Sequence, residues 1–393
     1  IYTQIFFIGG TIMDLIVYKQ GISQVTAIGI LSDCISYTYE KQFNAPGDFT
    51  ITLPYSDEYY KLVSREDMRD KLIQIDEHFL GIVYKVQKEL KSNQKRIIVK
   101  GKAVTNIFSH YIRQGISLSG TNVEVYSDNV EADMYHLITV GHTNQEQAGK
   151  VMPESVPLEI IHDVNTSQMS KAALSTCPVE DVTYLSFLES STSILGLGFD
   201  MTINQYNKLA SKLLYPKTRN DVILSTEFGD LYDSSYAENS LNYYASVVAI
   251  MLGNTNTGPI SAYLYQDGID RTKIDASQNK VYALTIDGTN VSVPSTKAMD
   301  YVQGLAKAFL ANHKLVSVYD SNINLANSKF ILGKHYELGD TILIQDKNLD
   351  LQTSAVLSSF TKTFDSSGVT ITPKFGFGQI TLSTLLNRNG VTK

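Results

Sequence analysis

The sequence of 393 residues predicts a β-rich α+β fold, with barrel-like strands at both ends of the chain and a mixed α/β middle. Apolar and polar residues alternate with period two from Ile28 to Val104, which is the pattern of half-buried strands. The same pattern returns between Asp340 and Pro373 as a meander of short strands. Between these ends, apolar residues recur at helical spacing. A chain of this length has room for about two to three domains with sizeable cores.

The first predicted structure is a hairpin that includes the stretch YEKQFNAPGDFTITLP at residues 39–54. Pro46 and Gly47 suit the central positions of a type II turn, because Pro fixes φ and Gly accepts a positive φ. We therefore expect a rigid loop from Asn44 to Asp48. The apolar residues expected on the inner faces of its two strands are Tyr37, Tyr39, Phe43, Phe49, Ile51 and Leu53.

Further elements are expected in order along the chain. Residues 59–71 are rich in charge and form a short helix or a loop, and KSNQKR at 91–96 is a solvated turn between strands. Helices are predicted within 129–141, 179–199 and 295–314, with Ser295 as a candidate N-cap of the last. Strands are predicted within 71–86, 96–104, 199–216, 221–231, 281–293, 340–345, 353–364 and 369–373.

These elements suggest a division of the chain. We expect an N-terminal tube-like β-barrel domain at 13–108 and a helix-containing middle domain at 109–215. A second α+β domain, barrel-like with an insertion, is expected at 216–330, and C-terminal strands completing a barrel at 331–393. The chain begins with Ile, and its first Met is Met13, so residues 1–12 are expected to be an extension.

Composition narrows the function classes. The formal net charge is −7, which gives no basic surplus for neutralising nucleic-acid phosphates, so specific nucleic-acid binding is not expected. No apolar run is long enough for a transmembrane helix, so membrane insertion is not expected either. The two cysteines, Cys34 and Cys177, lack zinc-site or disulfide-framework spacing and are expected to be buried, unpaired thiols.

A search for catalytic and cofactor motifs gives no positive signal. His136 and His142 do not share a helical face, and LGLGF at 195–199 follows a helix and lacks the third glycine of a dinucleotide loop. Two carboxylate pairs have the spacing to be considered for glycoside hydrolysis, but turn chemistry explains such pairs equally well. We therefore predict no catalytic, cofactor-binding or metal-binding residue and no cofactor. The two pairs are Glu227 with Asp230, and Asp267 with Asp270.

Several of these turn motifs, taken in their order along the chain, resemble a known family. The opening hairpin resembles the start of the tail-hub proteins of siphophages that infect Gram-positive hosts, which are related to hubs of contractile tails and R-type bacteriocins. The matching positions of the hairpin are Phe43, Asn44, Pro46, Gly47, Asp48, Phe49 and Pro54. Residues 101–114, 222–252, 267–277 and 336–376 also resemble family segments, although Gly229-Asp230 stands where the family often has Gly-Asn.

This resemblance implies a structural protein without enzymatic activity. Such hubs are homotrimers whose subunits each contribute two tube-like barrels, so that the trimer is pseudo-hexameric. The implied partners are the tail tube protein, a central spike protein, the tape measure and baseplate wedge proteins. The implied location is the tail of a virion or tail-like particle, assembled in the host cytoplasm.

Two other functions stay open. The chain has 24 Tyr and no Trp, and Tyr-rich stretches such as LNYYASVV at 241–248 fit surfaces that bind carbohydrate or protein as well as aromatic residues at the end of a barrel. The first alternative is therefore a tail-tip protein that binds a host cell-surface carbohydrate. The second is a glycan hydrolase that uses one of the carboxylate pairs.

Overall fold

The computed structural model describes residues 14–376 apart from 22–23, 65–69, 92, 111, 114–157, 161–181, 254–257, 267–268, 270, 272, 274–279, 290–295, 297, 314 and 326–327. Several expectations lie outside the described residues. These are the extension at 1–12, the helix at 129–141 with its two histidines, the cap at Ser295, Cys177, and the pair Asp267 and Asp270.

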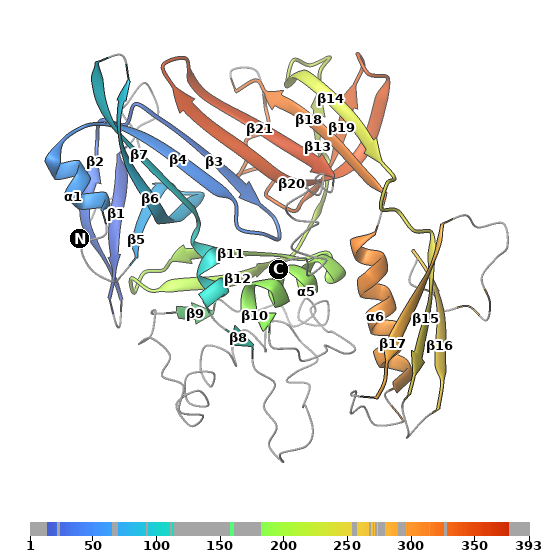
Figure 1. Ribbon diagram of the computed structural model, residues 1–393. Helices are drawn as coiled ribbons and strands as arrows, with labels where there is room; N and C mark the ends of the chain where they lie inside the picture. The colour runs from blue at the N-terminus through green and yellow to red at the C-terminus, as the bar shows by residue number, and fades with distance from the viewer. Residues whose placement is uncertain are drawn as a thin grey trace, which may run out of the picture.

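The described part of the chain is β-rich with few helices, as the sequence predicts, and four groups of elements can be followed in Figure 1. We call the first group the N-terminal unit. Its elements are β1 (Leu15–Gln20), β2 (Val25–Leu31), β3 (Ser36–Gln42), β4 (Asp48–Pro54), α1 (Asp57–Val63), β5 (Lys71–Asp76), β6 (Phe79–Lys91), β7 (Gln94–Ala103) and the 3₁₀ helix η1 (Val104–His110).

The middle unit follows and lies beneath the strands of the N-terminal unit in Figure 1. Its helix begins at the N-cap Thr183, whose hydroxyl accepts a hydrogen bond from the Ser186 amide, and ends at Gly196 with φ of 66°. The elements of this unit are β8 (Ile112–Arg113), β9 (Leu158–Ile160), β10 (Val182–Thr183), α5 (Tyr184–Leu195), β11 (Gly198–Ile203) and β12 (Leu209–Leu214).

The remaining strands form a C-terminal unit, into which an insert unit is placed. The C-terminal unit contains β13 (Thr218–Ser225), β14 (Leu231–Asn239), β18 (Val316–Ile323), β19 (Thr341–Asp346), β20 (Leu351–Asp365) and β21 (Gly368–Gly376). The insert unit contains β15 (Ser246–Leu252), β16 (Ile260–Tyr265), β17 (Val281–Asp287) and α6 (Ala298–Asn312). It leaves the sheet after β14 and returns at β18, and these two strands pair with each other.

One hydrogen-bonded sheet of 13 strands runs through the N-terminal and C-terminal units, in the order β14-β18-β21-β20-β3-β4-β7-β6-β5-β1-β2. Strand β19 also pairs with β20, and β13 pairs with β19. The two units meet where β20 pairs antiparallel with β3, from Ser359 opposite Gln42 to Phe364 opposite Tyr37. Within the described residues this order is open at both ends, so the strands do not close a barrel within one chain.

Each of the two large units has its own hydrophobic core. The inner-face residues predicted from the alternating pattern are all buried, from Ile51 at 0% exposed to Phe43 at 6%. The C-terminal strand β20 adds Phe360 to the core of the N-terminal unit, where it packs edge-on against Tyr39 at 6.1 Å between ring centroids. The cores of the two units are therefore joined by side chains as well as by main-chain pairing.

The prediction of a type II turn at Pro46-Gly47 is wrong. Gly47 has no positive φ, which a type II turn requires at that position. Glycine is needed there because the backbone approaches β3 closely: a Cβ on Gly47 would lie 1.8 Å from the carbonyl oxygen of Glu40. The Gly47 carbonyl in turn accepts a hydrogen bond from the Ala103 amide at 2.7 Å. The loop is therefore fixed by contacts with β3 and β7.

Candidate functional site: a buried junction between three units

The loop between β3 and β4 lies where the N-terminal, middle and C-terminal units meet. The Phe43 amide donates to the carbonyl of Ser358 in β20 at 2.9 Å, and the Phe43 carbonyl accepts from the amide of Phe199 in β11 at 3.1 Å. Its ring occupies the space beside two glycines. If Gly198 carried a Cβ, that atom would lie 2.4 Å from the Phe43 ring. A Cβ on Gly339 would lie 2.1 Å from the same ring. Phe43 thus contacts all three units at once.

A buried ion pair ties the C-terminal unit to the N-terminal unit. The Lys362 ammonium in β20 lies 2.7 Å from Oδ2 of Asp76 at the end of β5, and these side chains are 12% and 8% exposed. The same carboxylate accepts hydrogen bonds from the Tyr39 hydroxyl at 2.7 Å and from the His78 amide at 2.8 Å. A buried charge is tolerated when it is paired and hydrogen-bonded in this way.

Burial alone would raise the pKa of Asp76, and the charge and hydrogen bond of Lys362 oppose this effect. Together with the hydrogen bonds from Tyr39 and His78, they hold the pKa of Asp76 below its ordinary value of 3.8. Burial and the neighbouring Asp76 carboxylate raise the pKa of the Tyr39 phenol far above its ordinary value. Asp76 is therefore ionised and Tyr39 is a neutral donor at neutral pH, so neither is suited to proton transfer.

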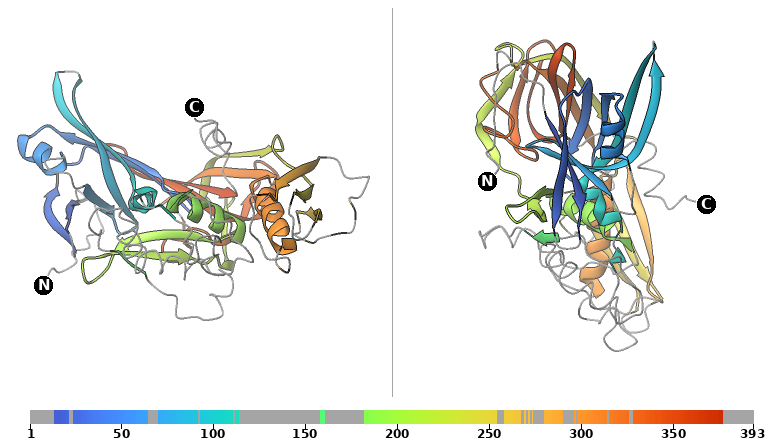
Figure 2. Two further views of the ribbon diagram at one scale, coloured as in Figure 1. Left: turned by 60° about the horizontal axis from the view of Figure 1, so that its bottom comes forward. Right: turned by 90° about the vertical axis from the view of Figure 1, so that its left-hand side faces the viewer.

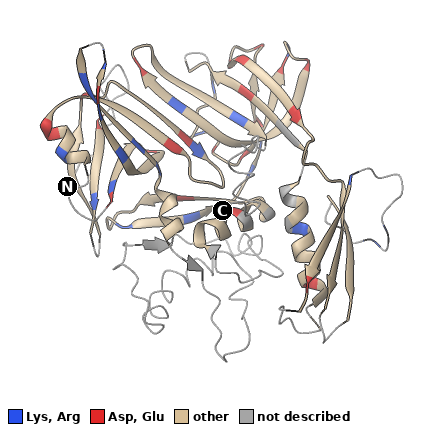
Figure 3. Ribbon diagram, viewed as in Figure 1, with Lys and Arg blue, Asp and Glu red and all other residues tan. Residues whose placement is uncertain are grey.

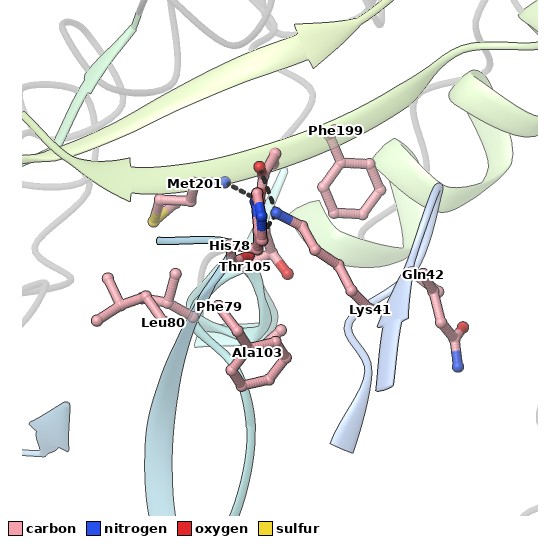
Figure 4. A pocket seen from close by; sticks show the side chains of 12 residues that line it. Lys41, Gln42, His78, Phe79, Leu80, Ala103, Thr105, Phe199 and Met201 are labelled. Carbon is pink, nitrogen blue, oxygen red and sulfur yellow. Dashed lines mark hydrogen bonds and ion pairs between the residues drawn. The ribbon is translucent and has the colours of Figure 1, made fainter. Parts of the chain in front are cut away.

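A second ion pair ties the middle unit to the same region. The Lys41 ammonium in β3 lies 2.8 Å from Oδ2 of Asp200 in β11 and donates to the His78 carbonyl at 2.6 Å. Both charged side chains are about four-fifths or more buried, at 16% and 15% exposed. Figure 4 shows the Lys41 ammonium beside His78, and the ring of Phe199 lies on its other side.

A small hollow adjoins this second pair. It has a volume of about 10 Å³ and is lined by residues that include Lys41, His78, Thr105 and Met201 (Figure 4). This is room for about one water molecule. It is far below the several hundred Å³ of a typical small-molecule site, so it does not fit a sugar or a nucleotide.

Glu227 and Asp230 have two separate local roles in the structure. Glu227 is exposed and lies 3.2 Å from the ammonium of Lys347. Asp230 is 3% exposed and accepts a hydrogen bond from the Ser225 amide at 3.3 Å, inside the turn between β13 and β14. One carboxylate is at the surface in an ion pair, and the other is buried and accepts a hydrogen bond within a turn.

The other candidates from the sequence have structural roles where they are described. Gly196 in LGLGF ends α5, and Gly198 makes room for the Phe43 ring. Cys34 is half-buried and unpaired, and burial raises the pKa of its thiol to about 11. In the described part of the chain no cluster of three or more His, Cys, Asp or Glu could hold a metal ion, and no helix is long and apolar enough to cross a membrane.

The sequence analysis missed both ion pairs, although the alternating pattern carried a signal for them. Lys41 continues the inward face of Tyr37 and Tyr39, and Lys362 stands between Phe360 and Phe364. A lysine on the buried face of a strand requires a buried partner. The sequence alone does not say that these partners are Asp200 and Asp76.

A further buried carboxylate fixes the C-terminal unit. Asp340 is 3% exposed and accepts from Arg219 Nε at 2.7 Å and from the Lys217 and Glu337 amides at 3.0 and 3.1 Å. We expect Asp340→Ala to lower the free energy of unfolding by about 2–4 kcal/mol, because it removes a buried carboxylate and leaves the Arg219 guanidinium and two backbone amides without their acceptor. Urea unfolding measures this. Glu227→Ala is the matched control, with a change within about 0.5 kcal/mol; equal losses in the two variants would contradict the assigned role of Asp340.

Comparisons with known proteins agree with this fold. A family model described as Siphovirus ReqiPepy6 Gp37-like protein matches residues 23–377. The prophage MuSo2 43 kDa tail protein from Shewanella oneidensis shares the fold with TM-score 0.54 and 10% identity, over 92% of this chain and 98% of that one. A tail protein from Neisseria meningitidis MC58 has TM-score 0.53 and 10% identity, over 93% of this chain and 97% of that one.

A third solved structure has the same fold. The prophage tail protein gp18 from Listeria monocytogenes EGD-e gives TM-score 0.51 and 12% identity, covering 96% of this chain and 99% of that one. A search of curated protein sequences finds no match. Since the family model covers most of the chain, the chain belongs to the Siphovirus ReqiPepy6 Gp37-like protein family.

Proposed function

We propose that this protein is the structural hub of a phage tail or tail-like particle, which adapts a sixfold tail tube to a threefold spike. The observation that carries this proposal is the continuous sheet: one chain presents two β-rich units side by side, joined edge to edge by β3 and β20. Three copies around an axis would present six such units to the tube and three chains to the spike. Closed rotational symmetry of this kind is the rule for homo-oligomers.

The junction supports a role in which the two units are held rigidly. Main-chain pairing, the Lys362–Asp76 ion pair and the Phe43 ring all cross from one unit to the next. An adapter between two symmetries needs fixed spacing between its units. The buried contacts at the junction are of the kind that fixes such spacing, because close-packed protein interiors resist deformation.

The face of the sheet turned away from the core supports a water-filled channel. Around the junction between β3 and β20 it carries short hydroxyl side chains, and the hydroxyls of Thr38 and Thr363 lie 3.3 Å apart across the two units. Around this junction the face has few large apolar side chains that would bind a polymer moving through the channel. The residues concerned are Ser36, Thr38, Thr50, Thr52, Thr361, Thr363, Thr370 and Thr372.

The partners that we propose are the tail tube and the central spike, with the tape measure and baseplate wedges as further neighbours. We propose no catalytic activity and no bound cofactor. The domain division at 13–108, 109–215, 216–330 and 331–393 is likewise our proposal. The carbohydrate-binding alternative gains little from the aromatic cluster of the insert unit, because Tyr282, Phe309 and His313 stack on one another at 4.0–4.3 Å between ring centroids.

Mixing the purified chain with the tube and spike proteins of the same particle tests this proposal. We expect native mass spectrometry to give a complex with three copies of the chain for each spike, which also binds tube protein. Binding to neither protein would overturn the hub. Binding of the isolated chain to purified host cell-wall glycans, with no binding to tube or spike, would instead favour the carbohydrate-binding tail tip.

A further inference from the structure

The hairpin of β6 and β7 extends beyond the strands on either side of it. Strand β6 runs to Lys91, but its neighbour β5 pairs with it only as far as Ile82. On the other side, the pairing of β4 with β7 ends at Arg96. We call residues 84–100 of this hairpin the basic arm. Figure 1 and both views of Figure 2 show it as an extension from the sheet.

The basic arm concentrates positive charge in a chain that is negative overall. Six of its seventeen residues are Lys or Arg and one is Glu, whereas the formal net charge of the whole chain is −7. Figure 3 shows Lys and Arg on both strands of the hairpin. A local charge of this kind attracts partners of the opposite charge. The cationic residues are Lys85, Lys88, Lys91, Lys95, Arg96 and Lys100.

One face of the basic arm is covered by its own unit. The Lys88 ammonium lies 3.8 Å from the centre of the Tyr60 ring, and the Lys95 ammonium lies 5.6 Å from the centre of the Tyr55 ring. These tyrosines belong to α1 and to the segment before it, so this face packs within the N-terminal unit. The opposite face is exposed or half-exposed. By the strand register it carries Lys85, Gln87, Glu89, Lys91, Gln94, Arg96, Ile98 and Lys100.

The open face contains a repulsion that the described residues do not neutralise. Lys85 and Lys100 are direct cross-strand partners, and both side chains are exposed. Like charges directly opposite each other are unfavourable. Within the part of the chain that the structure describes, neither lysine is in an ion pair, whereas Lys102 nearby lies 3.6 Å from Asp48. A carboxylate from outside the chain would remove the repulsion between Lys85 and Lys100.

We propose that the basic arm binds an acidic surface of another protein of the tail. This inference rests on the proposed hub function and names the chemistry of one of its partners. Leu90 at the tip is 67% exposed, and an apolar side chain among cations suits a protein surface whose carboxylates surround an apolar recess. A nucleic acid fits less well, because its phosphates offer no apolar recess and the acidic remainder of the chain would repel it.

Reversing the charge of the cross-strand pair tests this inference. Lys85→Glu with Lys100→Glu keeps two like charges opposite each other at exposed positions, so folding should be unaffected and only the sign changes. The probes are the purified tail tube and spike proteins of the same particle, measured separately. We expect the Kd for one of them to rise about tenfold or more. Lys329→Glu with Lys334→Glu, at exposed positions between β18 and β19, makes the same change in net charge and should leave both Kd values unchanged.

Two further measurements separate the contributions of charge and apolar contact. Raising the salt concentration from about 50 mM to about 300 mM should weaken the binding of the unmodified chain but not that of the Lys85→Glu, Lys100→Glu variant, because salt screens the attraction that the variant lacks. Leu90→Ser should raise the same Kd several-fold without changing its salt dependence, because it removes an apolar contact and no charge.

The other outcomes overturn the inference in distinguishable ways. Unchanged Kd values in the Lys85→Glu, Lys100→Glu variant, or an equal rise in the control variant, would overturn the basic arm as the docking surface but leave the hub intact. Charge reversal that affects only binding to a short DNA duplex or to phosphatidylglycerol vesicles would replace the acidic protein by phosphate groups. An unmodified chain that binds neither tube nor spike would remove the hub and this inference with it.

Discussion

Replacing Lys362 by Ala is expected to lower the free energy of unfolding by about 3–5 kcal/mol. The substitution removes the cation from a carboxylate that is 8% exposed and leaves Asp76 with only the hydrogen bonds from Tyr39 and His78. Because the ion pair joins β20 to β5, the loss weakens the junction between the N-terminal and C-terminal units. Urea unfolding at neutral pH measures the change.

The matched control is Lys374→Ala. Lys374 also reaches from the C-terminal unit to the N-terminal unit, where it lies 3.7 Å from Oε1 of Glu40, but these side chains are 38% and 28% exposed. A solvated pair of this kind contributes little, so we expect a loss below about 1 kcal/mol. Similar losses in both variants would show that burial of Asp76 is not the reason for the effect.

The pH dependence of the free energy of unfolding is a second test of the Lys362→Ala substitution. A carboxylate with a depressed pKa in the folded state stabilises the fold above its unfolded pKa, and this stability is lost as pH falls through the folded pKa. In the unmodified chain the contribution of Asp76 is therefore complete above about pH 4. Without the charge and hydrogen bond of Lys362, we expect burial, which is the largest single influence on Asp76, to raise the pKa of this carboxylate. The stability difference between the two chains should then narrow as pH falls from 7 toward 4; a constant difference would contradict this assignment.

Replacing Phe43 by Ala is expected to lower the free energy of unfolding by about 3–5 kcal/mol, the range for deleting a buried aromatic side chain. The Phe43 ring fills the space between Gly198 and Gly339. Neither glycine has a side chain that could fill this space when the ring is removed. The loss affects all three units, so limited proteolysis should cut the folded variant between units faster than it cuts the unmodified chain. Phe228→Ala, at a position 67% exposed, is the control and should change stability by less than about 0.5 kcal/mol.

Strands could be predicted from the sequence where apolar and polar residues alternate regularly, because such residues are alternately buried and exposed. The pattern from Tyr37 to Leu53 predicted the inner face of β3 and β4, and the apolar stripe of residues 295–314 predicted α6, because both depend on local periodicity. The pairing of β3 with β20 could not be predicted in this way. It joins residues more than three hundred positions apart, and its register depends on packing between units rather than on either strand alone.

The junction shows the same limit at the level of single residues. Pro46-Gly47 predicted a local turn of a particular type, whereas the structure uses Gly47 for a close approach to Glu40. The motif was correct as a position that requires glycine and wrong about the physical reason. The resemblance of several such motifs to tail-hub proteins nevertheless pointed to the family, because their order along the chain is more specific than any one turn.

The solution mass of the purified chain tests the central claim most directly. Light scattering across a dilution series should give a mass near three times the 43.6 kDa of one chain for the chain alone, or that mass plus the mass of the spike when the spike is added. A trimer would support a hub in which three chains supply six β units. A mass of one chain at every concentration, with the spike present as well as absent, would contradict the threefold hub.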